Sequence, residues 1–356
     1  MRITGCFTAV LCLAALALGT VNALAAEPDS DLRLVIAVTQ PTEMPPATTI
    51  SLLDPRSGAV SELYRDPKAG RHLLVKIAGS DVLGSARAAP PADIYAFVGP
   101  TVADPGALDA LSVLRVPRPG AQAAWKQVLE VPLSFSEASP YGLWNRAPLL
   151  AVSPRQDRAA ITALRIGERA LAGPMIRVLS MYGTEEWQLA VGKGLRVVDF
   201  AWSPDGKQLA YALSPEGDEH TLEESLLPQA GVYVADVAAR TSSFLQHCYP
   251  VAVAWPPKGD RITIAVQPDV WGTAGVVRTI AFPGGKRSEE FSVAGSAEAL
   301  AWSDDGRWLA VQLAEKGVQV VQMRASSGGW GRDIFRLPAG DGRLALLGWV
   351  RLPRGG

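Results

Sequence analysis

A six-residue phrase recurs along this chain at nearly constant intervals, and it limits the possible folds more than any other feature. Clear copies, each of the form Ala-Trp-x-x-x-Gly, occupy residues 201–206, 254–259 and 301–306, and a divergent copy occupies residues 348–353. The tryptophan in the second position recurs at intervals of 53, 47 and 47 residues. Such a period indicates stacked supersecondary units, because no single unit can bury its own apolar face.

Each clear copy precedes an alternating apolar run, at residues 209–213, 262–266 and 309–313. Asp-Gly, present in the first and third copies, is a strong hairpin signal when alternating apolar residues flank it. Each phrase therefore predicts an inner strand, a tight turn and the start of a second strand. We expect the tryptophans to pack between neighbouring units, because they are large apolar side chains on a strand.

Further segments extend this pattern over the rest of the chain. Eroded copies of the phrase lie at residues 151–156 and 86–91, and the second of these has no tryptophan. Six similar apolar segments predict six third strands, at residues 49–58, 111–116, 176–181, 232–237, 276–281 and 318–323.

The two ends of the chain complement each other. The last phrase, at Trp349, has no second strand after it, and the strand predicted at Leu32–Val38 has no phrase before it. We expect these two strands to pair, which removes exposed strand edges. The sequence therefore predicts an all-β fold: a six-bladed β-propeller of four-stranded antiparallel blades, closed by pairing of the N- and C-terminal strands in one blade.

Residues 1–26 are predicted to be a secretory signal peptide, and residues 27–356 the propeller. A basic start at Arg2 leads into an apolar stretch and then into small residues, which favours cleavage after Ala25 or Ala26. An uncleaved anchor is the alternative, although the apolar stretch is short for a membrane-spanning helix. We therefore expect a periplasmic protein with no membrane insertion after cleavage.

Composition and motifs argue against several functions. A net charge of −1, from 34 basic and 35 acidic residues, gives no electrostatic footprint for nucleic acid. The chain has no Gly-x-Ser-x-Gly elbow, and only Cys248 of its three cysteines lies outside the predicted signal peptide. His247 and Cys248 are neighbours on a predicted strand and would point to opposite faces, which argues against a metal site. We expect no catalytic residue, cofactor or metal, and hence no enzyme.

The phrase Ala201–Gly206 and the following Lys207–Tyr211 resemble the repeat of TolB-type propellers, which is related to WD-repeat blades. The resemblance covers nearly all of residues 27–356 and is weakest at residues 86–91. It implies six blades and a periplasmic location. TolB carries an α/β domain before its propeller, so we expect a TolB-like propeller without that domain. Because prolyl oligopeptidase-like enzymes have similar repeats, the resemblance points to a fold more than to a function.

The long insertions are all expected on the face opposite the phrase turns, which we call the long-loop face; the other is the short-turn face. Binding residues are often carried on long loops over a rigid scaffold, and aromatic residues are enriched at interfaces. The candidate binding residues on these loops are Tyr141, Trp144, His220, Glu223 and Trp271.

The function expected from these features is a monomeric, non-catalytic scaffold. It would bind a protein or peptide partner in the cell envelope through the long-loop face and the channel mouth. Two alternatives remain open: a propeller enzyme, hydrolase or lyase, with its active site at the channel mouth, and a glycan-binding module that uses the loop aromatics.

Overall fold

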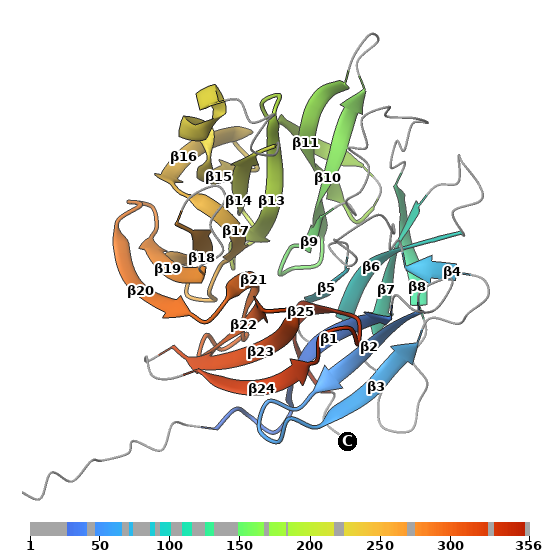
Figure 1. Cartoon of the computed structure of the whole chain (residues 1–356). Coiled ribbons are helices and arrows are strands. Elements are labelled where there is room, and N and C mark those ends of the chain that lie inside the picture. The colour runs from blue at the N-terminus through green and yellow to red at the C-terminus, as the bar shows by residue number, and fades with distance from the viewer. Residues whose placement is uncertain are drawn as a thin grey trace, which may run out of the picture.

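The strands of the protein form small antiparallel sheets arranged around a central axis (Figure 1). The computed structural model describes residues 27–40, 47–65, 71–73, 86–89, 93–100, 109–115, 125–131, 149–166, 171–182, 184–216, 224–268, 275–326 and 331–352. In these residues one helical element, the 3-10 helix η1 (Glu224–Gln229), accompanies the strands.

Five sheets of the described chain have four strands each, and their order follows the sequence repeat. From the axis outward, the sheet that joins the two ends contains β25 (Arg343–Arg351), β1 (Leu32–Gln40), β2 (Ala47–Leu53) and β3 (Val60–Arg65). The next two contain β9 (Leu150–Val152), β10 (Arg158–Ile166), β11 (Leu171–Ser180) and β12 (Glu185–Ala190), and then β13 (Leu195–Trp202), β14 (Gln208–Pro215), β15 (Gly231–Asp236) and β16 (Thr241–His247). The last two contain β17 (Tyr249–Ala254), β18 (Arg261–Gln267), β19 (Gly275–Ala281) and β20 (Arg287–Val293), and then β21 (Ser296–Trp302), β22 (Trp308–Glu315), β23 (Val318–Ala325) and β24 (Arg332–Leu337).

The prediction of six regular blades needs correction, because five of the described sheets are regular four-stranded blades. The remaining sheet has five strands: β4 (Arg71–Leu73), β5 (Ala86–Ala89), β6 (Asp93–Pro100), β7 (Asp109–Arg115) and β8 (Trp125–Val131). Its inner position is divided, since β4 and β5 pair with successive parts of β6. This sheet contains the eroded phrase without tryptophan, so the departure occurs where the repeat signal is weakest.

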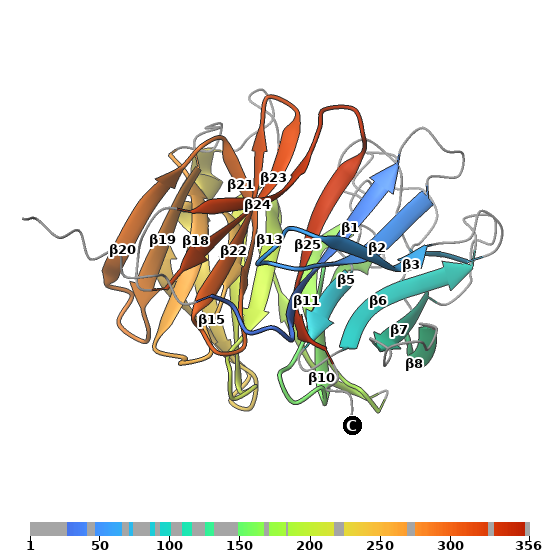
Figure 2. The same cartoon turned by 90° about the horizontal axis from the view of Figure 1, so that it is seen from below.

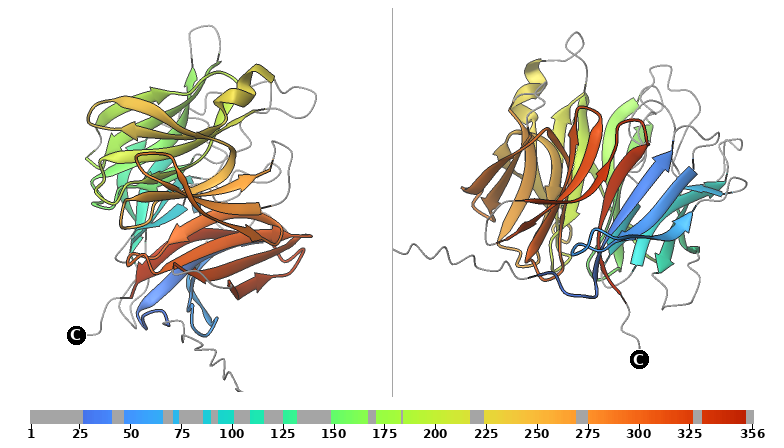
Figure 3. Two further views of the ribbon diagram at one scale, coloured as in Figure 1. Left: turned by 90° about the vertical axis from the view of Figure 1, so that its left-hand side faces the viewer. Right: turned by 60° about the horizontal axis from the view of Figure 1, so that its bottom comes forward.

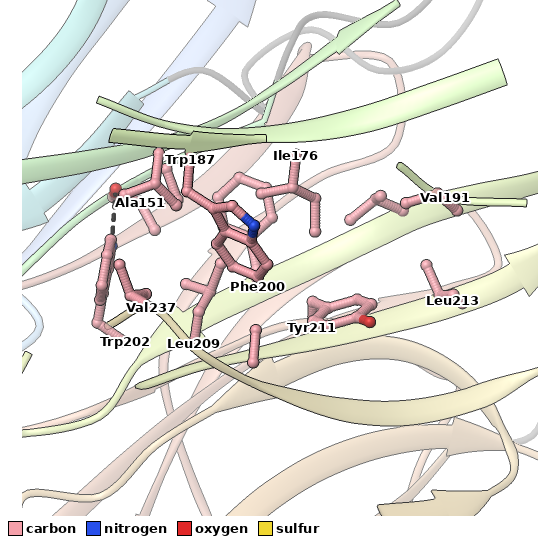
Figure 4. Packing of buried hydrophobic residues seen from close by; sticks show 14 of the residues in the cluster. Ala151, Ile176, Trp187, Val191, Phe200, Trp202, Leu209, Tyr211, Leu213 and Val237 are labelled. Atoms are coloured by element: carbon pink, nitrogen blue, oxygen red, sulfur yellow. Dashed lines mark hydrogen bonds between the residues drawn. The ribbon is translucent and has the colours of Figure 1, made fainter. Parts of the chain in front are cut away.

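The tryptophans of the phrase are packing residues, as the sequence predicted. Trp202, Trp255 and Trp349 are 6%, 8% and 2% exposed. Trp202 lies in an apolar cluster between two neighbouring blades (Figure 4), where its indole Nε1 donates a hydrogen bond to the carbonyl of Ala151 at 3.1 Å. Trp349 makes the equivalent bond to Ala301 at 2.9 Å. Trp202 and Trp349 thus bond to the blade before their own, whereas the indole of Trp255 donates to the carbonyl of Gly259 in its own turn at 3.3 Å.

The polar residues of the phrase build its turn. The hydroxyl of Ser203 donates to Oδ1 of Asp205 at 2.7 Å and accepts from the amide of Gln208 at 2.9 Å. The hydrogen bond from Ser203 is also the main reason that the pKa of Asp205 lies below its ordinary value. Gly206 has a φ of +68°, a conformation that strains residues with a side chain. The conspicuous residues of the phrase therefore serve structure.

Both ends of the described chain contribute to one sheet. β1 and β25 pair antiparallel, with Leu34 opposite Trp349, and they lie side by side in Figure 2. Arg351 at the end of β25 binds Oδ1 of Asp31 at 3.0 Å and Oδ1 of Asp304 at 2.8 Å. Contacts between inner strands run from β5 to β9, β13, β17, β21, β25 and back to β5.

The described turns and connections fall on two faces (Figures 2 and 3). The phrase turns, such as Asp205-Gly206, lie on the short-turn face with the end of β25. The connection from β14 to β15, which carries η1, lies on the opposite, long-loop face. The inner strands β13, β17, β21 and β25 begin at this long-loop face and run to the short-turn face.

Candidate functional site at the channel mouth

The loop residues proposed from the sequence remain a prediction. Tyr141, Trp144, His220, Glu223 and Trp271 all lie outside the described residues. The neighbouring described segments, η1 before β15 and the first residues of β17, belong to the long-loop face. The site is therefore built here from the inner strands, whose first residues surround the axis at that face.

Four equivalent positions mark the beginning of four inner strands. They lie six residues before the tryptophan of each phrase and are occupied by Arg196, Tyr249, Ser296 and Arg343. Each of these side chains is partly buried, and the next residue of each strand is buried. We call these four residues the mouth ring. The four side chains differ in chemistry: two are guanidinium groups, one is a phenol and one is an aliphatic hydroxyl. The strands and turns that carry them nevertheless repeat from blade to blade.

The inner strands contain β-bulges a few residues after the mouth ring. In β13, β17 and β21 the pairing skips the residue four before the tryptophan: Val198, Val251 and Glu298. In β25 the skipped residue is Leu347. A bulge bends the strand and redirects a side chain, and bulges are frequent beside functional sites. Of these positions, that of β21 carries an exposed carboxylate, Glu298.

A buried amide joins Glu298 to the closing strand. Gln312 on β22 is 4% exposed, and its Nε2 donates to Oε2 of Glu298 at 2.7 Å and to the carbonyl of Leu344 at 2.9 Å. Its Oε1 accepts from the amide of Leu346 at 2.8 Å. The amide of Leu344 donates a further hydrogen bond to Oε1 of Gln319 at 2.5 Å. Gln312 on β22 and Gln319 on β23 therefore bridge their strands to β25, and Gln312 also holds the carboxylate of Glu298.

Asp199, the acidic residue of β13, has a structural role. It is 7% exposed, and its Oδ2 accepts a hydrogen bond from the amide of Val253 on β17 at 3.0 Å. The carboxylate thus satisfies a backbone donor of the next blade, which would otherwise be costly to bury. This places Asp199 among the interblade contacts.

The wall beside the mouth ring is aromatic. The rings of His247 and Tyr249 meet edge to face at 5.6 Å, and Nδ1 of His247 lies 2.9 Å from the carbonyl of Ala230, just after η1. Between them Cys248 is 7% exposed, and burial raises the pKa of its thiol to about 12. A thiol with so high a pKa is a poor nucleophile and metal ligand at neutral pH. The exposed His247 and the partly exposed Tyr249 are therefore the groups of this segment that are available for recognition.

The described residues contain no group of three or more His, Cys, Asp or Glu side chains placed to hold a metal ion. Among the helices of the described segments, none is long and apolar enough to cross a membrane.

No protein-family description matches the sequence, and no curated protein sequence matches it. Solved structures do match the fold. A protein described as TolB from Agrobacterium tumefaciens aligns with a TM-score of 0.55 at 13% identity, covering 91% of this chain and 99% of that chain. TolB from Acinetobacter baumannii aligns with a TM-score of 0.57 at 15% identity, covering 92% of this chain and 69% of that chain. The chain therefore has a TolB-like propeller fold, as the repeat predicted.

The mouth ring was not singled out from the sequence. Its four residues share no type, so no motif marks them. A positional signal was present, since the ring recurs with the same intervals of 53, 47 and 47 residues as the tryptophans. Comparing the copies column by column, and asking which partly exposed position varies, would have found it.

Proposed function

We propose that this protein is an exported, periplasmic propeller that binds a protein or peptide partner through its long-loop face and channel mouth, without catalysing a reaction. The observation that carries the proposal is the mouth ring. Arg196, Tyr249, Ser296 and Arg343 occupy equivalent, partly exposed positions on a repeated framework, yet they differ in chemistry. Repeat proteins place recognition at variable positions over a constant scaffold.

The residue types favour a macromolecular partner. Arginine and tyrosine are over-represented at the energetically important positions of protein interfaces. Guanidinium groups donate several hydrogen bonds in a fixed plane, which suits peptide carbonyls and carboxylates. The TolB-like fold supports the same kind of role by analogy of architecture alone.

A pull-down from the cell envelope with wild-type protein and two variants tests the proposal. Tyr249→Ala removes an aromatic group of the mouth ring, and Trp144→Ala with Trp271→Ala removes two loop aromatics. We expect both variants to lose the captured partner while their circular dichroism spectra stay unchanged. Lys258→Ala, in an exposed turn of the short-turn face, is the matched control and should retain the partner. Full capture by Tyr249→Ala and by the double variant would contradict the proposal.

Export is a separate part of the proposal. The signal peptide proposed at residues 1–26 would be removed, so the mature chain would begin at Ala26 or Glu27. Intact-mass measurement of the protein from the periplasmic fraction checks this directly. Recovery of the full-length chain in the membrane fraction would instead indicate an uncleaved anchor.

A further inference from the structure

The outer rim of the propeller contains one strand edge that differs from the others. Six strands form the outer edges of the described sheets: β3, β8, β12, β16, β20 and β24. Five of them carry at least two Lys, Arg, Asp or Glu residues each, and β16 (Thr241–His247, TSSFLQH) carries none. Charged side chains on edge strands prevent a further strand from pairing there. β16 is therefore the described outer edge that lacks this protection.

The exposed part of this edge is well defined. Thr241, Ser242, Ser243 and Phe244 are all exposed, whereas Leu245 and Gln246 are partly buried. The β19–β20 turn of the next blade covers the strand at Leu245, where a Cβ on Gly285 would lie 2.8 Å from the Leu245 carbonyl. The accessible edge therefore consists of the four residues Thr241–Phe244.

Phe244 is held as an exposed aromatic anchor. One row of aromatic residues crosses the blade, with Phe200, Tyr211, Tyr233 and Phe244 opposite one another on successive strands. Tyr211 and Tyr233 stack at 5.3 Å, and Tyr233 meets Phe244 edge to face at 5.2 Å. The row is 3% and 4% exposed at Phe200 and Tyr211 but 50% exposed at Phe244. An apolar side chain placed beside Phe244 would extend this row outward.

The serines beside Phe244 are already engaged inward. The hydroxyl of Ser242 lies 2.5 Å from that of Tyr211, and the hydroxyl of Ser243 donates to the carbonyl of Val234 at 3.4 Å. These bonds hold β16 against β14 and β15 of its own sheet. The edge is thus a fixed, uncharged template whose outward groups are backbone amides and carbonyls, and a β-strand is the ligand that matches such a row.

We propose that the edge at Thr241–Phe244 binds an extended, uncharged segment of a partner protein as an added strand, with an apolar residue of that segment against Phe244. This inference extends the proposed scaffold role with a second surface, on the rim instead of the long-loop face. A peptide segment fits better than a second copy of this chain. Two rims meeting along four residues each would bury much less than the roughly 1,200–2,000 Å² of a standard stable interface, whereas an extended peptide can follow the edge alone.

The test uses the mature protein and three synthetic peptides with blocked ends. The first alternates threonine and valine over seven residues. The second has proline at its centre, which removes a backbone donor and disfavours strand pairing. The third has aspartate at its centre. Hydrogen exchange resolved by segment reports protection of β16. We expect the first peptide to slow exchange at Thr241–Phe244 about tenfold at saturation, and the other two to have little effect.

Variants of the protein give the matched comparison. Ser243→Lys places a charge on the unprotected edge, and we expect it to weaken binding of the first peptide at least about tenfold. Ser292→Lys makes the same change at an exposed serine of β20, an edge that already carries charges, and should bind the peptide like wild type.

Several results would overturn the proposal. They are no protection of β16 by the first peptide, equal protection by the proline peptide, or equal loss from Ser292→Lys. A dimer in sedimentation that Ser243→Lys dissociates would assign the edge to a second copy of the chain. The peptide comparison on wild-type protein decides the question even where Ser243→Lys does not fold. Tyr249→Ala should bind the peptide normally, so failure at the channel mouth and failure at the rim are distinguishable.

Discussion

Replacing Gln312 with leucine should weaken the whole propeller, because this residue connects β22 to the last strand of the chain. The substitution removes the bonds from Nε2 to the Leu344 carbonyl and to Glu298, and the bond from the Leu346 amide to Oε1. Two backbone groups of β25 then remain buried without these partners. Each unsatisfied group costs about 1–3 kcal/mol, and the added apolar burial of leucine returns part of the loss.

We therefore expect Gln312→Leu to lower the free energy of unfolding by about 2–4 kcal/mol. For a domain of this size that corresponds to a fall of about 3–6 °C in Tm. Urea titration followed by tryptophan fluorescence measures the first quantity, and calorimetry measures the second. Gln229→Leu, at an exposed glutamine of η1, is the matched control and should change stability little. A loss below about 0.5 kcal/mol, or an equal loss in the control, would refute the bridging role of Gln312.

Three further predictions concern packing, pH and reactivity. Trp202→Phe should cost about 2–4 kcal/mol in urea titration, because it removes a buried indole and the partner of the Ala151 carbonyl; an unchanged midpoint would contradict the packing role. Hydrogen bonds from arginine side chains hold the pKa of Asp29 below its ordinary 3.8, so its contribution to stability is present above that pH and is lost as the pH falls through the lower folded-state pKa. The urea midpoint should therefore fall as the pH is lowered below about 4. A fall of the same size in Asp29→Asn would show that this carboxylate is not its cause. Cys248, buried and with its pKa raised to about 12, should react with iodoacetamide slowly in the native protein and rapidly in urea, and equal rates would show that the thiol is accessible.

Most of the strand order could be predicted because the phrase combines local and tertiary signals at one place. Asp205 and Gly206 specify a turn, and Trp202 needs a neighbouring blade to bury its indole. Together they fix where an inner strand ends and which surface it packs on. The same reasoning located the strand Leu32–Val38, and that strand does pair with the strand that carries Trp349.

The irregular sheet could not be predicted in the same way. Ala86–Ala89 carries no tryptophan, so nothing in the sequence ties it to a neighbour or separates it from a short strand such as Arg71–Leu73. The inner position of that sheet is divided because both segments pair with β6. A strand of three or four residues leaves too weak a periodic signal to be recognised alone.

The binding positions proposed at the mouth ring escaped prediction for the opposite reason. Trp202 and its equivalents are conspicuous because they recur, and they recur because packing demands the same residue each time. Arg196 and Tyr249 stand at a position where packing leaves the side chain partly exposed, so the residue type is free to vary. The unprotected edge of β16 was likewise visible only after the outer strands could be compared with one another.

Photo-crosslinking in living cells tests most directly whether the long-loop face and channel mouth bind a protein partner. A photoreactive amino acid at Ser296, in the mouth ring, is compared with one at Lys258, in an exposed turn of the short-turn face. We expect a discrete crosslinked protein from position 296 that Tyr249→Ala abolishes, and none from position 258. Crosslinks of equal yield from both positions, or none from position 296 while the protein is exported and folded, would contradict this expectation.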